Sequence, residues 1–304
     1  MNRWRGLVAG MLAWMVSGVM TTSEGQTRRE RGLGPFTVVT PRGEFVIRLL
    51  RREGDFIWVD RLTREGVFVE TGMESGIAIR EIVRLVSDRP PLFELAEQPV
   101  ESMTEEQLNQ IHNALRTYAA RFRPYRDIPG IRADEATRIQ AGLYQRQEMW
   151  RDAYLLYRDL LTRDYRVADR ETIQLRAGLC LWRMEQKERA IPYLTVETVP
   201  DEDLYFMSEV FLARADALTS VGRYRESLED LLRLIVFYPF TGRNEARSLL
   251  ACIPNYVGIH DWDAAYKTLM ALDEDYPDQP ETEQARALLA RYQEELEKEQ
   301  QFQP

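Results

Sequence analysis

The sequence predicts an α+β chain in which a small N-terminal β-barrel precedes an all-α helical solenoid. Two observations carry this prediction. Short β-rich runs separated by turn residues fill residues 35–87, and amphipathic helical hairpins recur at a near-constant interval through residues 134–298. A single hairpin of this kind cannot bury its apolar face alone, so a fixed interval indicates units that stack on one another.

The barrel prediction depends on the strand pattern of residues 35–87. Period-two alternation with Gly-containing turns predicts strands, and a one-turn helix is expected at 80–82. Because a small sheet must hide its edges, five or six short strands favour a closed barrel. This stretch loosely resembles an SH3-like or Sm-like barrel in its strand spacing and its closing residues 77–86. The expected strands are 36–40, 44–50, 55–59, 66–70, 76–79 and 83–86.

Residues 1–25 are expected to be a secretory signal peptide. Arg3 and Arg5 precede the uncharged apolar run 7–20, and small residues follow at the expected cut. An uncleaved anchor is the alternative. The prediction places the protein outside the cytoplasm, most simply in a bacterial periplasm, with no transmembrane segment after cleavage. Residues 26–34 are polar and are expected to form a disordered lead-in.

Residues 88–103 contain three prolines and are predicted to be a linker. Thr104 and Gln107 then form a capping-box pattern, which predicts the start of a helix. Apolar residues follow at helical spacing until Pro124, so residues 104–133 are expected to form a bridging or capping helix and a loop.

The solenoid prediction depends on four turns, each followed by a small residue that lets two helices approach. The most regular copy is 221–239. Pro280 is expected to begin a last helix that caps the array, and residues 299–304 form a tail. The small residues lie at intervals of 37, 37 and 38 residues and are Ala153, Ala190, Ser227 and Ala265.

Residues 134–296 resemble the tetratricopeptide-repeat (TPR) family. The best-matched unit carries Phe211, Ala215, Leu218, Gly222, Tyr224, Ser227, Leu231, Leu234 and Pro239. The closing Tyr-Pro pairs at 238–239 and 276–277 are similar to repeats of bacterial envelope proteins. Glu197 departs from the pattern, and Pro254 is expected to interrupt and kink its helix.

The resemblance implies a concave groove lined by the first helix of each hairpin, where a protein or peptide partner would bind. Trp182 beside Arg183 is the strongest anchor candidate, because Trp and Arg are enriched in interface hot spots. The candidate partner-binding residues are Arg138, Gln145, Arg146, Leu179, Trp182, Arg183, Asp216 and Arg247.

The search for chemistry predicts no catalytic residues, no metal site and no cofactor. His112 and His260 are the only histidines, and neither has a partner at metal-ligand spacing. Cys180 and Cys252 lie in apolar stretches and are expected to be buried free thiols; a disulfide in an oxidising compartment is the alternative.

These observations predict a non-catalytic, exported scaffold of the cell envelope that binds a protein or peptide. The net charge of −9 argues against nucleic acid as a partner. Three alternatives stay open. The terminal helix, through Leu288, Tyr292 and Leu296, could join copies into a homo-oligomer; Phe56 or Trp58 of the barrel could bind cell wall or another glycan; and a carboxylate–arginine cluster could form an enzyme site.

Overall fold

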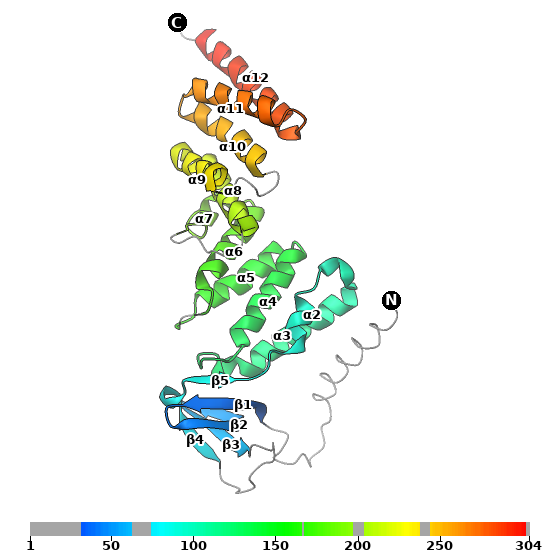
Figure 1. The fold of residues 1–304 in the computed structure, drawn as a ribbon, viewed down its shortest axis with the longest axis vertical. Coiled ribbons are helices and arrows are strands. Elements are labelled where there is room, and N and C mark those ends of the chain that lie inside the picture. Colours follow the sequence, from blue (N-terminus) through cyan, green and yellow to red (C-terminus); the bar gives the residue numbers. More distant parts are fainter. Residues whose placement is uncertain (1–31, 63–73, 166, 197–203, 238–243, 302–304) are drawn as a thin grey trace. The chain divides into compact units, whose positions relative to one another are not determined.

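The computed structural model describes residues 32–62, 74–165, 167–196, 204–237 and 244–301 (Figure 1). The chain divides into two compact units, Met1–Gln147 and Glu148–Pro304, here called the N-terminal unit and the C-terminal unit. Each is described by itself. Among the described residues, no helix is long and apolar enough to cross a membrane.

The N-terminal unit contains a five-stranded antiparallel sheet in the order β4-β3-β2-β1-β5. The predicted strands are present wherever the structure describes them, and the run at 66–70 lies outside the described residues. The closed barrel is wrong, because β4 and β5 form opposite edges of an open sheet. The strands are β1 (Leu33–Thr40), β2 (Gly43–Glu53), β3 (Phe56–Leu62), β4 (Ser75–Ala78) and β5 (Arg84–Val86), with the 3₁₀ turn η2 at Ile79–Glu81.

The sheet stays open because another part of the chain covers its apolar face. Ile47, Leu49 and Ile57 are fully buried on that face. Phe122 packs edge-on against Phe36 with ring centroids 5.9 Å apart, and the same core includes Tyr125 and Ile128. A second layer of this kind removes the need for strands to curl around their own core.

The β5 edge is also covered. The Leu85 amide donates to the Pro129 carbonyl at 2.7 Å. Gly130 follows with φ 93°, and a β-carbon there would lie 1.8 Å from the Leu85 oxygen. Only glycine combines this backbone conformation with so close an approach.

Residues 88–103, expected as a linker, carry a short packed helix, α2 (Pro91–Ala96), and the turn η3 (Val100–Ser102). Leu92 and Phe93 are buried in one cluster with residues of the next two long helices. The predicted capping box is confirmed, since Thr104 and Gln107 exchange both hydrogen bonds. The remaining elements of this unit are α3 (Glu105–Phe122), η4 (Arg123–Tyr125) and α4 (Ala133–Arg146).

The described secondary structure of the C-terminal unit consists of helices joined by turns and loops. The helix α10 continues through Pro254, so the predicted interruption at this residue is wrong. The helices are α5 (Trp150–Leu161), α6 (Arg170–Arg183), α7 (Lys187–Ala190), α8 (Leu204–Ser220), α9 (Tyr224–Phe237), α10 (Asn244–Gly258), α11 (Trp262–Asp275) and α12 (Pro280–Gln301).

The repeat is visible in the backbone as well as in the sequence. Glu148, Glu185, Gly222 and His260 have φ values of 59°, 57°, 74° and 61°. They are spaced by 37, 37 and 38 residues, as the sequence repeat predicts. The last three close α6, α8 and α10 with the paired hydrogen bonds of a Schellman motif, for example Arg223 to Leu218 at 2.9 Å and Gly222 to Thr219 at 3.0 Å. The small residues predicted to follow these turns are fully buried and are Ala153, Ala190, Ser227 and Ala265.

Candidate functional site

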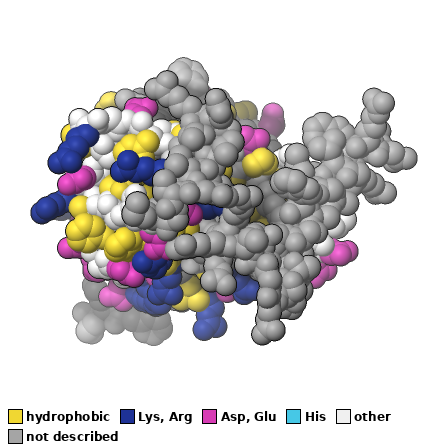
Figure 2. All heavy atoms as spheres, turned by 90° about the horizontal axis from the view of Figure 1, so that it is seen from below, with side chains coloured by type: hydrophobic (Ala, Val, Ile, Leu, Met, Phe, Trp, Pro, Cys, Tyr) yellow, Lys and Arg dark blue, Asp and Glu magenta, His cyan; other side chains and the backbone are white. Residues whose placement is uncertain are grey.

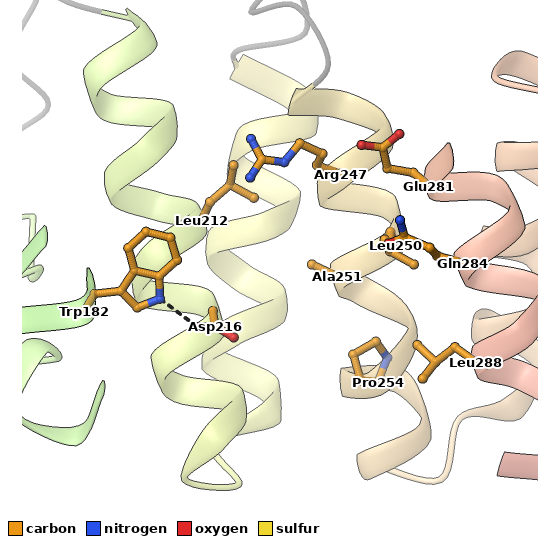
Figure 3. Close-up of a pocket in the computed structure, with 10 residues that line it drawn as sticks. All are labelled: Trp182, Leu212, Asp216, Arg247, Leu250, Ala251, Pro254, Glu281, Gln284 and Leu288. Carbon is orange, nitrogen blue, oxygen red and sulfur yellow. Dashed lines mark hydrogen bonds between the residues drawn. The ribbon is translucent and has the colours of Figure 1, made fainter. Parts of the chain in front are cut away.

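A groove with a volume of about 450 Å³ opens on the C-terminal unit. It is formed by α6, α8, α10 and α12, so it lies along alternate helices of the array, as the repeat pattern predicts (Figure 3). Its lining residues are Trp182, Leu212, Asp216, Arg247, Leu250, Ala251, Pro254, Glu281, Gln284 and Leu288.

Trp182 is held in place at one end of the groove. Its indole Nε1 donates to Asp216 Oδ2 at 2.6 Å (Figure 3). The Lys187 ammonium contacts the same oxygen at 2.8 Å. The hydrogen bond to Asp216 raises the pKa of Lys187. An indole fixed by its polar edge presents a rigid apolar surface, which lowers the entropy that a ligand must remove on binding.

Arg183 lies beside this anchor. Its guanidinium is 4.7 Å from the centre of the Trp182 ring and 5.6 Å from that of Trp150. It also pairs with Glu209 at 2.9 Å. This arrangement buries part of the arginine stem against aromatic surface while the charge stays near solvent.

The middle of the groove is apolar. Leu212, Ala251 and Leu288 contribute side chains from three different helices. Leu250 and Pro254 add to this surface from α10. Because proline has no backbone N–H, the Leu250 carbonyl lacks the donor that an ordinary residue at position 254 would supply.

Glu281 closes the groove from the first turn of α12. The residue is 9 % exposed, and its Oε2 atom has no hydrogen-bond partner. Figure 3 shows its carboxylate extending toward α10, whereas the guanidinium of Arg247 turns toward Leu212. Of the polar groups that line the groove, this carboxylate oxygen is buried and unpaired.

The predicted partner-binding residues are distributed as follows. Trp182, Asp216 and Arg247 line one groove, and Arg183 flanks it. Leu179 is 1 % exposed and packed in the core, so its predicted place in the groove is wrong. The remaining three lie on α4 of the N-terminal unit, where Arg146 donates to the Ala96 carbonyl; they are Arg138, Gln145 and Arg146.

Sequence reasoning missed the part of the site that comes from α12. Leu288 was assigned to a capping or self-association stripe, and Glu281 was not singled out. The signal that could have identified these two residues is the continued alternation of helices. It makes α12 equivalent to the first helix of a further hairpin, and first helices line the groove. Of the other residues of that stripe, Tyr292 is half-buried, and the side chain of Leu296 is outside the described residues.

The histidines and cysteines, which were considered as candidates for catalysis or metal binding, occupy structural positions. His112 is buried. Its Nε2 is 2.8 Å from Gln147 Oε1, and its ring stacks on Tyr144 with centroids 3.9 Å apart. His260 occupies a Schellman turn. No group of three metal-ligating side chains occurs in the described part of the chain. Cys180 and Cys252 are buried free thiols, as predicted, and burial raises the pKa of each to about 12.

The strand β3 resolves which aromatic residues of the sheet face outward. Ile57 and Val59 are fully buried, whereas Phe56 is 49 % exposed. The Arg51 guanidinium lies 4.9 Å above the Trp58 ring on that outer face. Figure 2 views the molecule from below Figure 1, and on that side basic and acidic side chains are interspersed over the described atoms. Such mixing gives no extended field of one sign on the part of the surface that is visible there.

No protein-family model matches this chain, and no curated protein matches it. Among solved structures, the chain is similar to YrrB, which is described as a TPR protein with an unusual peptide-binding site. The two share 18 % sequence identity with a TM-score of 0.49, and the similarity covers 66 % of this chain and 92 % of YrrB.

Proposed function

We propose that this protein is a non-catalytic scaffold that binds a protein or peptide partner in the groove between α6, α8, α10 and α12. The observation that carries the proposal is the groove itself, with a rigid Trp182 at one end and an unpaired Glu281 at the other. Concave surfaces of this kind are the usual binding surfaces of helical-repeat proteins.

The composition of the groove favours a polypeptide partner. An apolar middle formed by Leu212, Leu250 and Leu288 accepts aliphatic or aromatic side chains. Polar groups at both ends offer hydrogen bonds that fix the register of an extended segment. Trp182 and Arg247 are also of the residue types that dominate measured interface energies.

Site-specific photo-cross-linking tests this proposal. A photoreactive amino acid replaces Ala251 in the groove or, as the control, Met270, which is 64 % exposed on α11. The protein is expressed in its native host and irradiated. We expect a discrete cross-linked protein from position 251, absent from position 270 and lost when Trp182→Ala is added. Equal products from both positions would contradict the proposal.

We further propose that the scaffold acts in the cell envelope after export. Support comes from residues 1–25, whose charge pattern and apolar run are those of a signal peptide. Cell fractionation with N-terminal sequencing of the mature protein tests this location. The expected result is a periplasmic protein that begins near residue 26, and a cytoplasmic protein that retains Met1 would contradict it.

A second candidate function is binding of cell-wall glycan by the outer face of the sheet. The favouring observation is the outward placement of Phe56 beside Trp58, with Gly76 paired opposite Trp58 on β4. Aromatic faces next to a residue without a side chain can stack on a sugar ring. Retention on purified cell wall that is lost in Trp58→Ala, but kept in Ala251→Arg, would support this function.

A further inference from the structure

We propose that the groove selects a partner segment that places a cationic side chain, Lys or Arg, against Glu281 while neighbouring apolar side chains rest on Leu212, Leu250 and Leu288. This inference rests on the proposed function, because it names the chemistry of the partner at the same groove.

The first observation is the state of Glu281. Its Oε2 is shielded from solvent and accepts no hydrogen bond. A carboxylate oxygen in that state loses its hydration without compensation, which is unfavourable by an amount typical of unmade buried hydrogen bonds. A guanidinium or ammonium N–H from a ligand would supply the missing donor and the opposite charge in one contact.

The second observation is the charge around the groove. Asp216 already has its partners, since Trp182 and Lys187 both contact its Oδ2. Arg247 is exposed at the rim, and Figure 3 shows its guanidinium directed away from Glu281. The buried group that still lacks a partner is therefore acidic, while the unoccupied basic group is accessible to water.

The third observation is the charge of the whole chain, which is −9. A negative protein concentrates positive ligands near its surface and repels acidic ones. Long-range attraction and the local acceptor at Glu281 thus favour the same kind of partner. The apolar surface between Trp182 and Leu288 adds affinity without changing this preference.

Three peptides test the inference. Each has nine residues, is acetylated and amidated at its ends, alternates Leu and Ser, and differs only at the fifth residue, which is Lys, Gln or Glu. Binding of a fluorescent form of each is measured by anisotropy with the full chain. We expect the Lys peptide to bind about tenfold more tightly than the Gln peptide, because a charge-assisted hydrogen bond to a buried group has that effect.

Matched variants assign the preference to one residue. Glu281→Gln keeps the shape of the side chain and should abolish the difference between the Lys and Gln peptides. Glu283→Gln is the control, because Glu283 is an exposed acidic residue in the same turn of α12 and its loss changes the net charge equally. It should preserve the tenfold difference. Ala251→Arg, which fills the groove, should abolish binding of all three peptides.

Each outcome decides the inference. Equal affinities of the Lys and Gln peptides for the unmodified protein, with binding lost in Ala251→Arg, would overturn the cation preference and leave the binding groove intact. Tightest binding of the Glu peptide would also overturn it, since Arg247 would then determine the partner. No binding of any peptide to the unmodified protein would count against the inference and the proposed function together. The comparison of peptides on the unmodified protein does not depend on the folding of any variant.

Discussion

The left-handed turns of the repeat predict both the sign and the size of the stability change that a substitution there causes. Gly222 and Glu185 occupy equivalent positions 37 residues apart, with φ of 74° and 57°. A β-carbon on Gly222 would meet no heavy atom within 4 Å. In the folded protein, Gly222→Ala therefore adds backbone strain and no steric clash. A left-handed non-glycine residue costs about 1–2 kcal/mol, and the smaller entropy of the unfolded alanine chain offsets about 0.4–1 kcal/mol of it.

We therefore expect Gly222→Ala to destabilise the α8–α9 hairpin by about 1 kcal/mol. The reverse change, Glu185→Gly, relieves the same strain at the end of α6, so the same arithmetic predicts stabilisation by about 1 kcal/mol or less. The side chain of Glu185 is 81 % exposed, and its closest charged contact, Lys187, is 3.8 Å away. Its loss adds little to this difference, because such surface pairs are weak.

Hydrogen–deuterium exchange of helix amides is the suitable assay, because it reports local opening in one hairpin. Gly222→Ala should speed exchange in α8 and α9 about fivefold, while Glu185→Gly should slow exchange in α6 slightly. Destabilisation by both variants, or no change in Gly222→Ala, would refute the assignment of these residues to equivalent left-handed turns.

Three other predictions concern the core of each unit. Gly130→Ala should lower the stability of the N-terminal unit by at least about 3 kcal/mol in a urea titration, because its β-carbon would overlap the Leu85 carbonyl; a small effect would contradict the close approach at β5. Burial raises the pKa of Asp230 to about 6 although Arg214 lies 3.1 Å away. The folded protein therefore holds this proton after the unfolded chain has released it, so the unfolding free energy of the C-terminal unit should fall by roughly 1–3 kcal/mol as the pH rises from 4 to 6. Asp230→Asn should remove that fall, and a variant that retains it would contradict the assignment. Cys180 and Cys252 should resist a disulfide thiol reagent at pH 8 in the native protein and react fully after unfolding; rapid native reaction would contradict their burial.

The repeat could be predicted from the sequence because local signals determine it. A left-handed turn residue and a small buried residue recur with each hairpin, and Gly222 with Ser227 shows both. The closed barrel could not be judged in the same way. Strand alternation reveals that one face of the sheet is apolar, but not that Phe122 and Ile128, many residues later, cover it.

The site was only partly predictable for a related reason. The helix α6 is buried on nearly all sides, so its apolar periodicity does not separate the residues that face the groove from those in the core. Leu179 was expected in the groove for this reason, although it is buried in the core, whereas Trp182, chosen because its residue type favours interfaces, lines the groove. Glu281 carries no sequence signal, since an acidic residue after a helix-starting proline is ordinary.

The account depends most on the groove as the binding surface, and one affinity measurement tests it directly. The partner protein that is cross-linked from position 251 is purified, and its affinity is measured for the unmodified full chain, for Ala251→Arg and for Met270→Arg. The two variants place the same arginine side chain in the groove at position 251 and on the exposed surface at position 270, and arginine is well tolerated in helices. The account predicts at least tenfold weaker binding for Ala251→Arg and unchanged binding for Met270→Arg. Equal affinity of all three proteins would contradict it.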